Sequence, residues 1–191
     1  MAHYGDPAAY QSLDIVPEPQ WPEYSSAVTV ASPRNFAFID GQNLHLGIRD
    51  LGWRVDWRRL RVHLEEHYRV TRAFYFVGFI PDNQPLYTRL QKAGYTVVFK
   101  PVTYRGDGKP KGNVDAELVL QAMIEYPHYE RAVVVTGDGD FGCLVRHLYN
   151  KGKVERVLSP NRRRCSALLK RAARERLDFL EEARGKIQYK S

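Results

Sequence analysis

Short apolar runs alternate with amphipathic segments along most of the chain. The apolar runs are rich in β-branched and aromatic residues, which predicts strands over 35–40, 70–80, 95–102, 131–136 and 154–159. The segments between them repeat apolar residues at steps of three and four, which predicts helices over 42–50, 56–68, 85–93, 113–126 and 141–149, and a final helix after Ser166. Strands that alternate with helices predict an α/β fold around a central, mainly parallel five-stranded sheet with right-handed crossovers.

Acidic side chains stand where the predicted elements meet one edge of this sheet. Asp40 ends the first strand, Asp138 and Asp140 follow the fourth strand in the segment TGDGD, and Asp115 lies in the first turn of a helix. In open α/β sheets, sites are built at the carboxyl ends of the strands. Converging carboxylates repel one another unless a cation lies among them, and oxygen ligands suit Mg²⁺ or Mn²⁺. The alternatives are an ordinary Asp-Gly turn and an acid that only balances a helix dipole.

Three ordered motifs carry a family resemblance. They are FIDGQNL at 38–44, KGNVDAEL at 111–118 and TGDGDFGCLV at 136–145. Their order and separation resemble the NYN domain, a family that is similar to PIN-domain nucleases and includes the LabA-like proteins. The resemblance covers residues 35–182 and implies a PIN-like three-layer fold with helices on both faces of the sheet. It also implies a divalent-metal site and ribonuclease activity.

By position in these motifs, the resemblance implies a set of catalytic residues, of which the four acids would also hold the metal. They are Asp40, Asp115, Asp138, Asp140 and Asn43. Gln121 and Thr136 are expected to support them. Many family members carry an additional Asp where this chain has Gln121, so a second metal position is in doubt.

Positive charge is concentrated outside the first 33 residues. The chain has a net charge of +7, while residues 1–33 carry −4 and the remainder carries +11. A basic domain favours a polyanionic partner, and the absence of helix-turn-helix or zinc-finger patterns favours RNA. Two basic segments are candidates for contacts with RNA phosphates, the alternative being solvated loops. Their residues are Arg105, Lys109, Lys111, Arg162, Arg163 and Arg164.

Three functions remain open at this point. The leading hypothesis is a metal-dependent endoribonuclease, and the second is an RNA-binding or regulatory module of the same fold that cuts weakly or not at all. The third is a small-molecule phosphohydrolase or nucleotide binder, which is disfavoured because neither a Walker-type loop nor GxGxxG follows a strand.

The remaining segments set expectations about organisation. Residues 1–34 are expected to be a Pro-rich, flexible extension, and residues 183–191 a basic tail. Neither a membrane-spanning run nor a secretory signal is recognisable, and two cysteines form no disulfide framework, so we expect a cytoplasmic protein without membrane contact. Homodimerisation is left open. His63, His67 and Glu117 are expected to be solvated, although the histidine spacing also suits a metal.

Overall fold

The computed structural model describes residues 34–101, 103–104, 110–111 and 113–190, all of which belong to the larger of two units, residues 31–191. The strands are β1 (Asn35–Asp40), β2 (Val70–Gly78), β3 (Tyr95–Lys100), β4 (Thr103–Tyr104), β5 (Pro110–Lys111), β6 (Ala132–Val135), β7 (Val154–Ser159) and β8 (Leu177–Phe179). The α-helices are α1 (Gly41–Arg49), α2 (Trp57–Tyr68), α3 (Gln84–Lys92), α4 (Asp115–Ile124), α5 (Gly142–Asn150), α6 (Ala167–Ala173) and α7 (Arg184–Ile187). Short 3-10 segments are η2 (Pro81–Asn83), η3 (Gly139–Phe141), η4 (Arg162–Arg164), η5 (Arg174–Arg176) and η6 (Leu180–Ala183).

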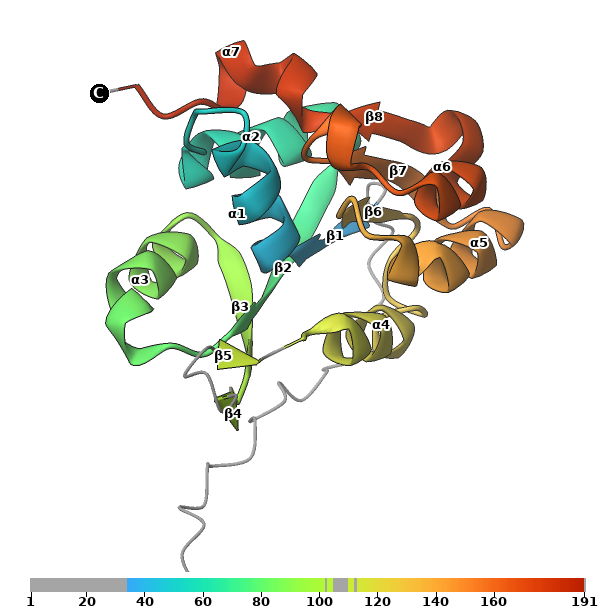
Figure 1. Ribbon diagram of the computed structural model, residues 1–191. Helices are drawn as coiled ribbons and strands as arrows, with labels where there is room; N and C mark the ends of the chain where they lie inside the picture. The colour runs from blue at the N-terminus through green and yellow to red at the C-terminus, as the bar shows by residue number, and fades with distance from the viewer. Residues whose placement is uncertain (1–33, 102, 105–109, 112, 191) are drawn as a thin grey trace, which may run out of the picture. The chain divides into compact units, whose positions relative to one another are not determined.

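Six parallel strands form the central sheet in the order β3-β2-β1-β6-β7-β8 (Figure 1). β1 lies in the middle, where Ile39 is paired with Tyr75 of β2 and Val135 of β6. Because the pairing is parallel and in step, β1 and β6 end at the same edge of the sheet. The prediction of an α/β fold with a mainly parallel sheet is confirmed.

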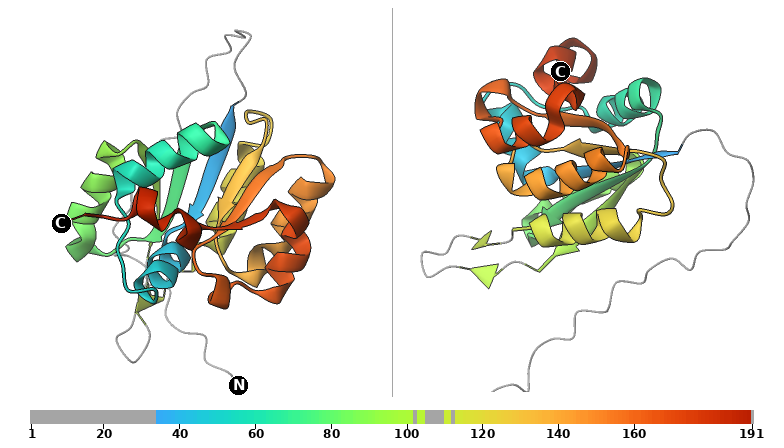
Figure 2. Two further views of the ribbon diagram at one scale, coloured as in Figure 1. Left: turned by 90° about the horizontal axis from the view of Figure 1, so that it is seen from above. Right: turned by 90° about the vertical axis from the view of Figure 1, so that its right-hand side faces the viewer.

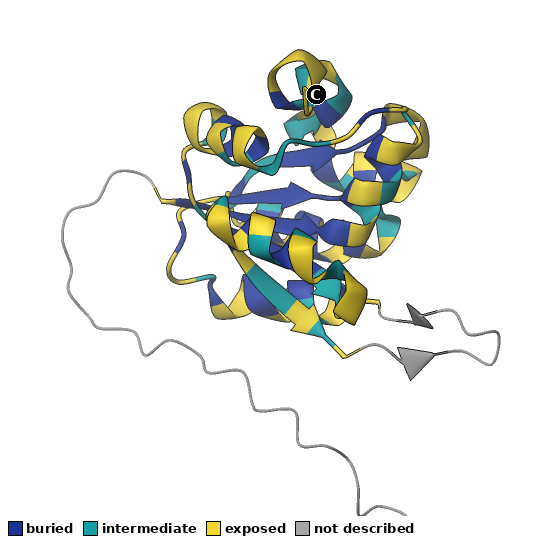
Figure 3. Cartoon of the chain, turned by 90° about the vertical axis from the view of Figure 1, so that its left-hand side faces the viewer, coloured by how far each residue is buried: buried dark blue, intermediate teal, exposed yellow. Residues whose placement is uncertain are grey.

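Helices cover both faces of the sheet, and a hydrophobic core lies beneath each layer (Figure 2). Successive β1 residues point to opposite cores, so that Phe36 and Phe38 pack with α4, α5 and α6, and Ala37 and Ile39 pack with α1 and α2. Every β1 residue is buried, as Figure 3 shows for the strands at the centre of the sheet. A strand with helices on both sides needs an uninterrupted apolar run, which explains why β1 was predicted with its observed bounds.

The sheet has a sixth strand where the sequence pattern predicted a continuous final helix. α6 ends at Ala173, Arg174 takes a left-handed φ of 52°, and β8 then pairs with the outer side of β7. The expectation of five strands and one long helix was therefore wrong. β8 is only three residues long, so its strand conformation depends on pairing with β7. The segment expected to be a basic tail contains α7, whose Ile187 is fully buried.

Two side chains that were expected to be solvated are instead enclosed or paired. His63 is buried on α2 beside Leu60 and Leu64, while its neighbour His67 stays exposed. Glu117 is half-buried and forms a 3.0 Å ion pair with Lys100. The expectation for Glu117 came from helix periodicity and that for His63 from the lack of a third metal ligand nearby in the sequence. Neither reports what a distant strand or helix places beside a side chain. None of the helices in the described segments has the length and apolar character needed to cross a bilayer.

Candidate metal centre

The carboxyl edge of the sheet brings acids from three separate segments together. Asp40 is the last residue of β1 and the N-cap of α1, where its Oδ1 accepts the backbone N–H of Asn43 at 3.0 Å. Asp115 is the first residue of α4, and Asp138 follows β6 at the N-cap of η3. Asp40 and Asp138 therefore lie at helix N-caps, where each carboxylate accepts a free backbone N–H of the helix that follows, whereas α4 has no side-chain cap.

The carboxylates of Asp115, Asp138 and Asp140 form one group, in which one oxygen from each residue lies within 4.8 Å of the others. Asp138 Oδ1 also accepts the backbone N–H of Asp140 at 3.0 Å, which orients the loop that carries both acids. Asp115 and Asp138 are half-buried, and Asp140 is exposed. Burial raises the pKa of Asp115, a hydrogen bond with Asn113 opposes this, and the charges of Asp138 and Asp140 raise the pKa further.

Asp40 is buried next to this group without being one of its three members. Its pKa is raised to about 6, chiefly by burial, while hydrogen bonds from Asn43 and Thr136 oppose the shift. The charges of Asp115 and Asp138 raise the pKa further, so the four carboxyl groups share one electrostatic environment. Asp40 Oδ2 accepts the Thr136 hydroxyl at 3.2 Å.

Thr136 and Asn43 hold the acidic loop against β1. The Thr136 Oγ1 that donates to Asp40 also accepts the backbone N–H of Asp138 at 3.1 Å. Asn43 Oδ1 accepts the backbone N–H of Gly137 at 2.7 Å. Thr136 and Asn43 thus fix the loop that carries Asp138 relative to Asp40. Neither side chain needs to contact a metal to do so.

A glycine allows the same loop to pack closely against α6. A Cβ on Gly139 would lie 2.4 Å from Ser166 Oγ, a separation that atoms do not tolerate. Ser166 is also the N-cap of α6, where its hydroxyl accepts the backbone N–H of Leu168. The Gly-Asp-Gly-Asp segment therefore places two acids in the loop, and Gly139 has no side chain that would push the loop away from α6.

The structure does not bring all the predicted residues to the acids. Gln121 is buried on α4, where its Nε2 donates to Glu125 Oε1 at 3.1 Å. Arg162 forms ion pairs with Glu181 and Glu182, and Arg164 forms one with Asp50 at 2.6 Å. Intramolecular partners already neutralise part of these two positive charges.

The other predicted phosphate contacts are less constrained by the structure. Arg163 is exposed in η4. Arg105 and Lys109 lie outside the described residues, and Lys111 is described only as backbone in β5. Their predicted contacts with RNA stay predictions.

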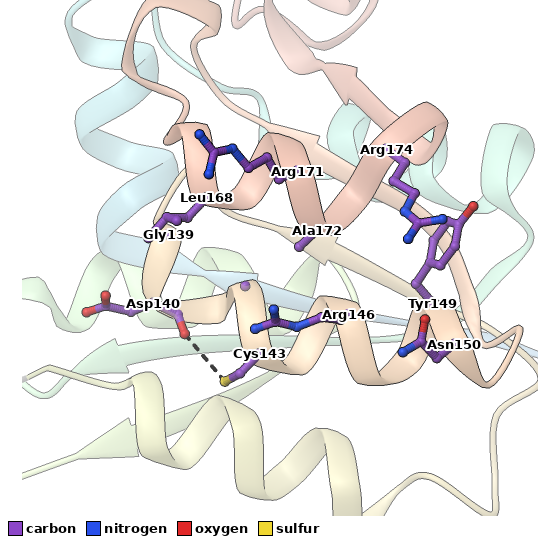
Figure 4. Close-up of a pocket in the computed structure, with 11 residues that line it drawn as sticks. Gly139, Asp140, Cys143, Arg146, Tyr149, Asn150, Leu168, Arg171, Ala172 and Arg174 are labelled. Atoms are coloured by element: carbon purple, nitrogen blue, oxygen red, sulfur yellow. Dashed lines mark hydrogen bonds between the residues drawn. The ribbon is translucent and has the colours of Figure 1, made fainter.

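The structure also adds basic residues that the sequence analysis did not select. Lys100 ends β3, its Nζ lies 2.6 Å from the Asn113 carbonyl oxygen, and its charge lowers the pKa of the nearby Asp115. In the sequence, the indication that Lys100 lies near the site was its position near the end of a predicted strand. Arg146 and Arg171 line a groove beside Asp140 (Figure 4). They come from different helices, so their proximity was not visible in the sequence.

The donor set of the acidic group fits a hard divalent cation. Within the described ranges, Asp115, Asp138 and Asp140 are the one group in which three or more acidic, His or Cys ligands come together. All three offer carboxylate oxygens, the ligands that Mg²⁺ and Mn²⁺ prefer. A cation would also remove the mutual repulsion that helps to raise the pKa of Asp115.

Comparison with known proteins supports the same fold and family. The low amplitude and bright protein LabA of Synechococcus elongatus is 27% identical over 124 residues, which cover 60% of this chain and 67% of LabA. A crystal structure of a protein of unknown function from Vibrio parahaemolyticus superposes with a TM-score of 0.68 at 22% identity. It covers 85% of this chain and all of the Vibrio chain, and shows the same α/β fold. The NYN domain matches residues 36–180, so the chain belongs to the NYN domain family.

Proposed function

We propose that this protein is a divalent-metal-dependent endoribonuclease that hydrolyses RNA phosphodiester bonds. The observation that carries the proposal is the group of three carboxylates within 4.8 Å at the carboxyl edge of the sheet. Membership of a family of PIN-like nucleases supports a hydrolytic reaction, and the basic domain supports a polyanionic substrate.

Asp115, Asp138 and Asp140 would hold Mg²⁺ or Mn²⁺, and Asp40 would complete the acidic site from its buried side. When bound, such a cation supplies Lewis-acid activation of water and neutralises charge on phosphoryl oxygens. Asp40 uses one lone pair of each carboxylate oxygen for Asn43 and Thr136. A carboxylate has about four acceptor positions, so Asp40 retains others for a ligand or a water.

The polar residues around the acids would keep this arrangement in place before substrate binds. Asn43 and Thr136 hold the loop through Gly137 and Asp138, so the carboxylates need little rearrangement. Lys100 places a positive charge beside Asp115, and its ion pair with Glu117 already offsets part of that charge. Pre-arranged charge of this kind is a large contribution to catalysis by many enzymes.

A second candidate is an RNA-binding module that does not cut. The observation in its favour is Gln121, which stands where many family members carry an acid and whose amide nitrogen donates to Glu125. This amide supplies no negative charge for a second metal. Cytoplasmic localisation stays a prediction from the sequence, and homodimerisation is left open.

Cleavage of a labelled single-stranded RNA with Mn²⁺ distinguishes the two candidates. We expect the wild type to cut within the RNA, EDTA to abolish the reaction and Asp138→Asn to reduce it by at least about 100-fold, in line with the loss of other groups that stabilise charge in a transition state. Glu130→Gln is the matched control, because Glu130 is an exposed carboxylate just before β6, at the opposite edge of the sheet. Equal cleavage by the wild type and Asp138→Asn would refute the proposal, and binding without cleavage would favour the RNA-binding module.

A further inference from the structure

A groove of about 440 Å³ opens beside the acidic group, between α5 and α6. Six of its lining residues matter here: Asp140, Arg146, Tyr149, Asn150, Arg171 and Arg174. Figure 4 shows Asp140 at one end of the groove and Arg174, Tyr149 and Asn150 at the other. The nine residues of α5 run beside it, and at a helical rise of 1.5 Å per residue they extend for about 14 Å.

The charge of this groove is mostly positive and mostly uncompensated. Three arginines and one carboxylate line the groove, and that carboxylate, Asp140, already belongs to the acidic group. Arg146 and Arg171 are exposed and have no ion-pair partner among the described residues. They differ in this from Arg162 and Arg164, whose guanidinium groups are held by acids.

Arg174 is held in place at the far end of the groove. Its guanidinium lies over the Tyr149 ring at 4.9 Å, and the Tyr149 hydroxyl donates to Glu175 at 2.7 Å. Its backbone has a φ of 52°, an uncommon conformation for a residue other than glycine. An arginine held over an aromatic ring loses less side-chain freedom when it binds an anion.

We propose that this groove binds the phosphodiester backbone of single-stranded RNA and leads it to the acidic group. A polyanion that approaches clustered carboxylates is repelled, and arginines next to them offset that repulsion. A guanidinium group binds a phosphate through two parallel hydrogen bonds. A flexible RNA strand can place successive phosphates against successive arginines. The part of this proposal in which the RNA leads to the acidic group rests on the proposed function.

The test measures binding in EDTA, so that no cleavage is needed. A short, unstructured, fluorescein-labelled oligoribonucleotide is titrated with full-length protein by fluorescence anisotropy between about 50 and 200 mM KCl. Arg146→Ala/Arg171→Ala is compared with wild type and with Arg58→Ala/Arg89→Ala. The control removes two exposed arginines from α2 and α3, whose buried residues pack in the core on the other face of the sheet.

We expect the groove variant to lower the slope of log K against log salt by about 1.4, because each lost phosphate contact on a single strand contributes about 0.7. The control should keep the wild-type slope, and all variants should keep the wild-type thermal midpoint. Equal slopes for the groove variant and the wild type would overturn the proposal. Tighter binding of duplex RNA than of single-stranded RNA would also overturn it, and equal binding of single-stranded DNA would support recognition of the backbone alone.

The same variants separate this proposal from the nuclease proposal. If the wild type binds RNA through the arginines but does not cut with Mn²⁺, the groove proposal is supported and the nuclease proposal is refuted. If the wild type cuts RNA and the groove variant binds and cuts RNA as well as the wild type does, the nuclease proposal is supported and the groove proposal is refuted.

Discussion

Asp140→Asn should stabilise the metal-free protein while it weakens stabilisation by metal. Asp140 is the exposed member of the acidic group, and its side chain accepts no hydrogen bond within the described part of the chain. The substitution keeps the shape of the side chain and removes its charge. It therefore tests electrostatic repulsion with little change in packing.

The separation of the carboxylates sets the expected magnitude. At 4.8 Å, two unit charges in a water-like dielectric repel by about 0.9 kcal/mol. Asp140 takes part in two such pairs, with Asp115 and Asp138, so its removal should stabilise the metal-free protein by about 1–2 kcal/mol. For a chain of this size, 1 kcal/mol corresponds to about 2–4 °C in the unfolding midpoint, so we expect a rise of about 2–8 °C.

Metal should stabilise the wild type more than the variant. A cation at about 100 times its dissociation constant stabilises the wild type by about 2.7 kcal/mol, or about 5–11 °C. At the same concentration the Asp140→Asn variant, which has lost one ligand, should gain less. Its advantage in EDTA should also shrink in about 1 M KCl, where the Debye length falls to about 3 Å.

Thermal unfolding followed by circular dichroism is the assay, in EDTA and then in increasing MnCl₂, with Glu130→Gln as control. Glu130→Gln should behave as the wild type in both conditions. A variant midpoint in EDTA at or below that of the wild type, together with an unchanged response to Mn²⁺, would refute the reasoning that these carboxylates repel one another and share a cation.

Three further predictions concern the surroundings of the site. Gly41→Ala should cost at least about 1–3 kcal/mol in urea unfolding, because its Cβ would lie 2.4 Å from the Tyr75 ring; an unchanged midpoint would mean that Tyr75 moves freely. Asn43→Ala should cost about 1–3 kcal/mol in the same assay, because the Gly137 N–H loses its acceptor; no loss would show that this bond does not hold the loop. Burial, with the charges of His67 and Lys186, lowers the pKa of His63 to about 4, against an ordinary value of 6.5. The folded state thus resists protonation, so stability should fall as the pH drops from about 6.5 towards 4; His63→Leu should lose about 1–2 kcal/mol less than the wild type between pH 7 and 5, and equal losses would contradict burial of a neutral His63.

Side-chain pattern alone determined much of the fold. β1 and β7 were predicted with their observed bounds. β1 is buried along its whole length and ends at Asp-Gly, whereas β7 mixes apolar and charged residues, is buried mainly in its second half and ends at Ser-Pro. The helix caps at Asp56 and Ser166 were also local, since each side chain accepts a backbone N–H two or three residues ahead. The order of strands and helices then placed Asp40 and Asp138 at one edge of the sheet, because parallel strands share an edge.

Other features were decided only by contacts between distant segments. β8 exists because Leu177–Phe179 pairs with β7, and His63 is buried although its own helix could equally have exposed it. The 4.8 Å separation of the carboxylates needs α4 to dock beside the loop after β6, and the groove needs α5 and α6 to bring Arg146 and Arg171 together. Periodicity states which residues share a face, whereas packing in three dimensions sets the distances on which charge, metal binding and catalysis depend.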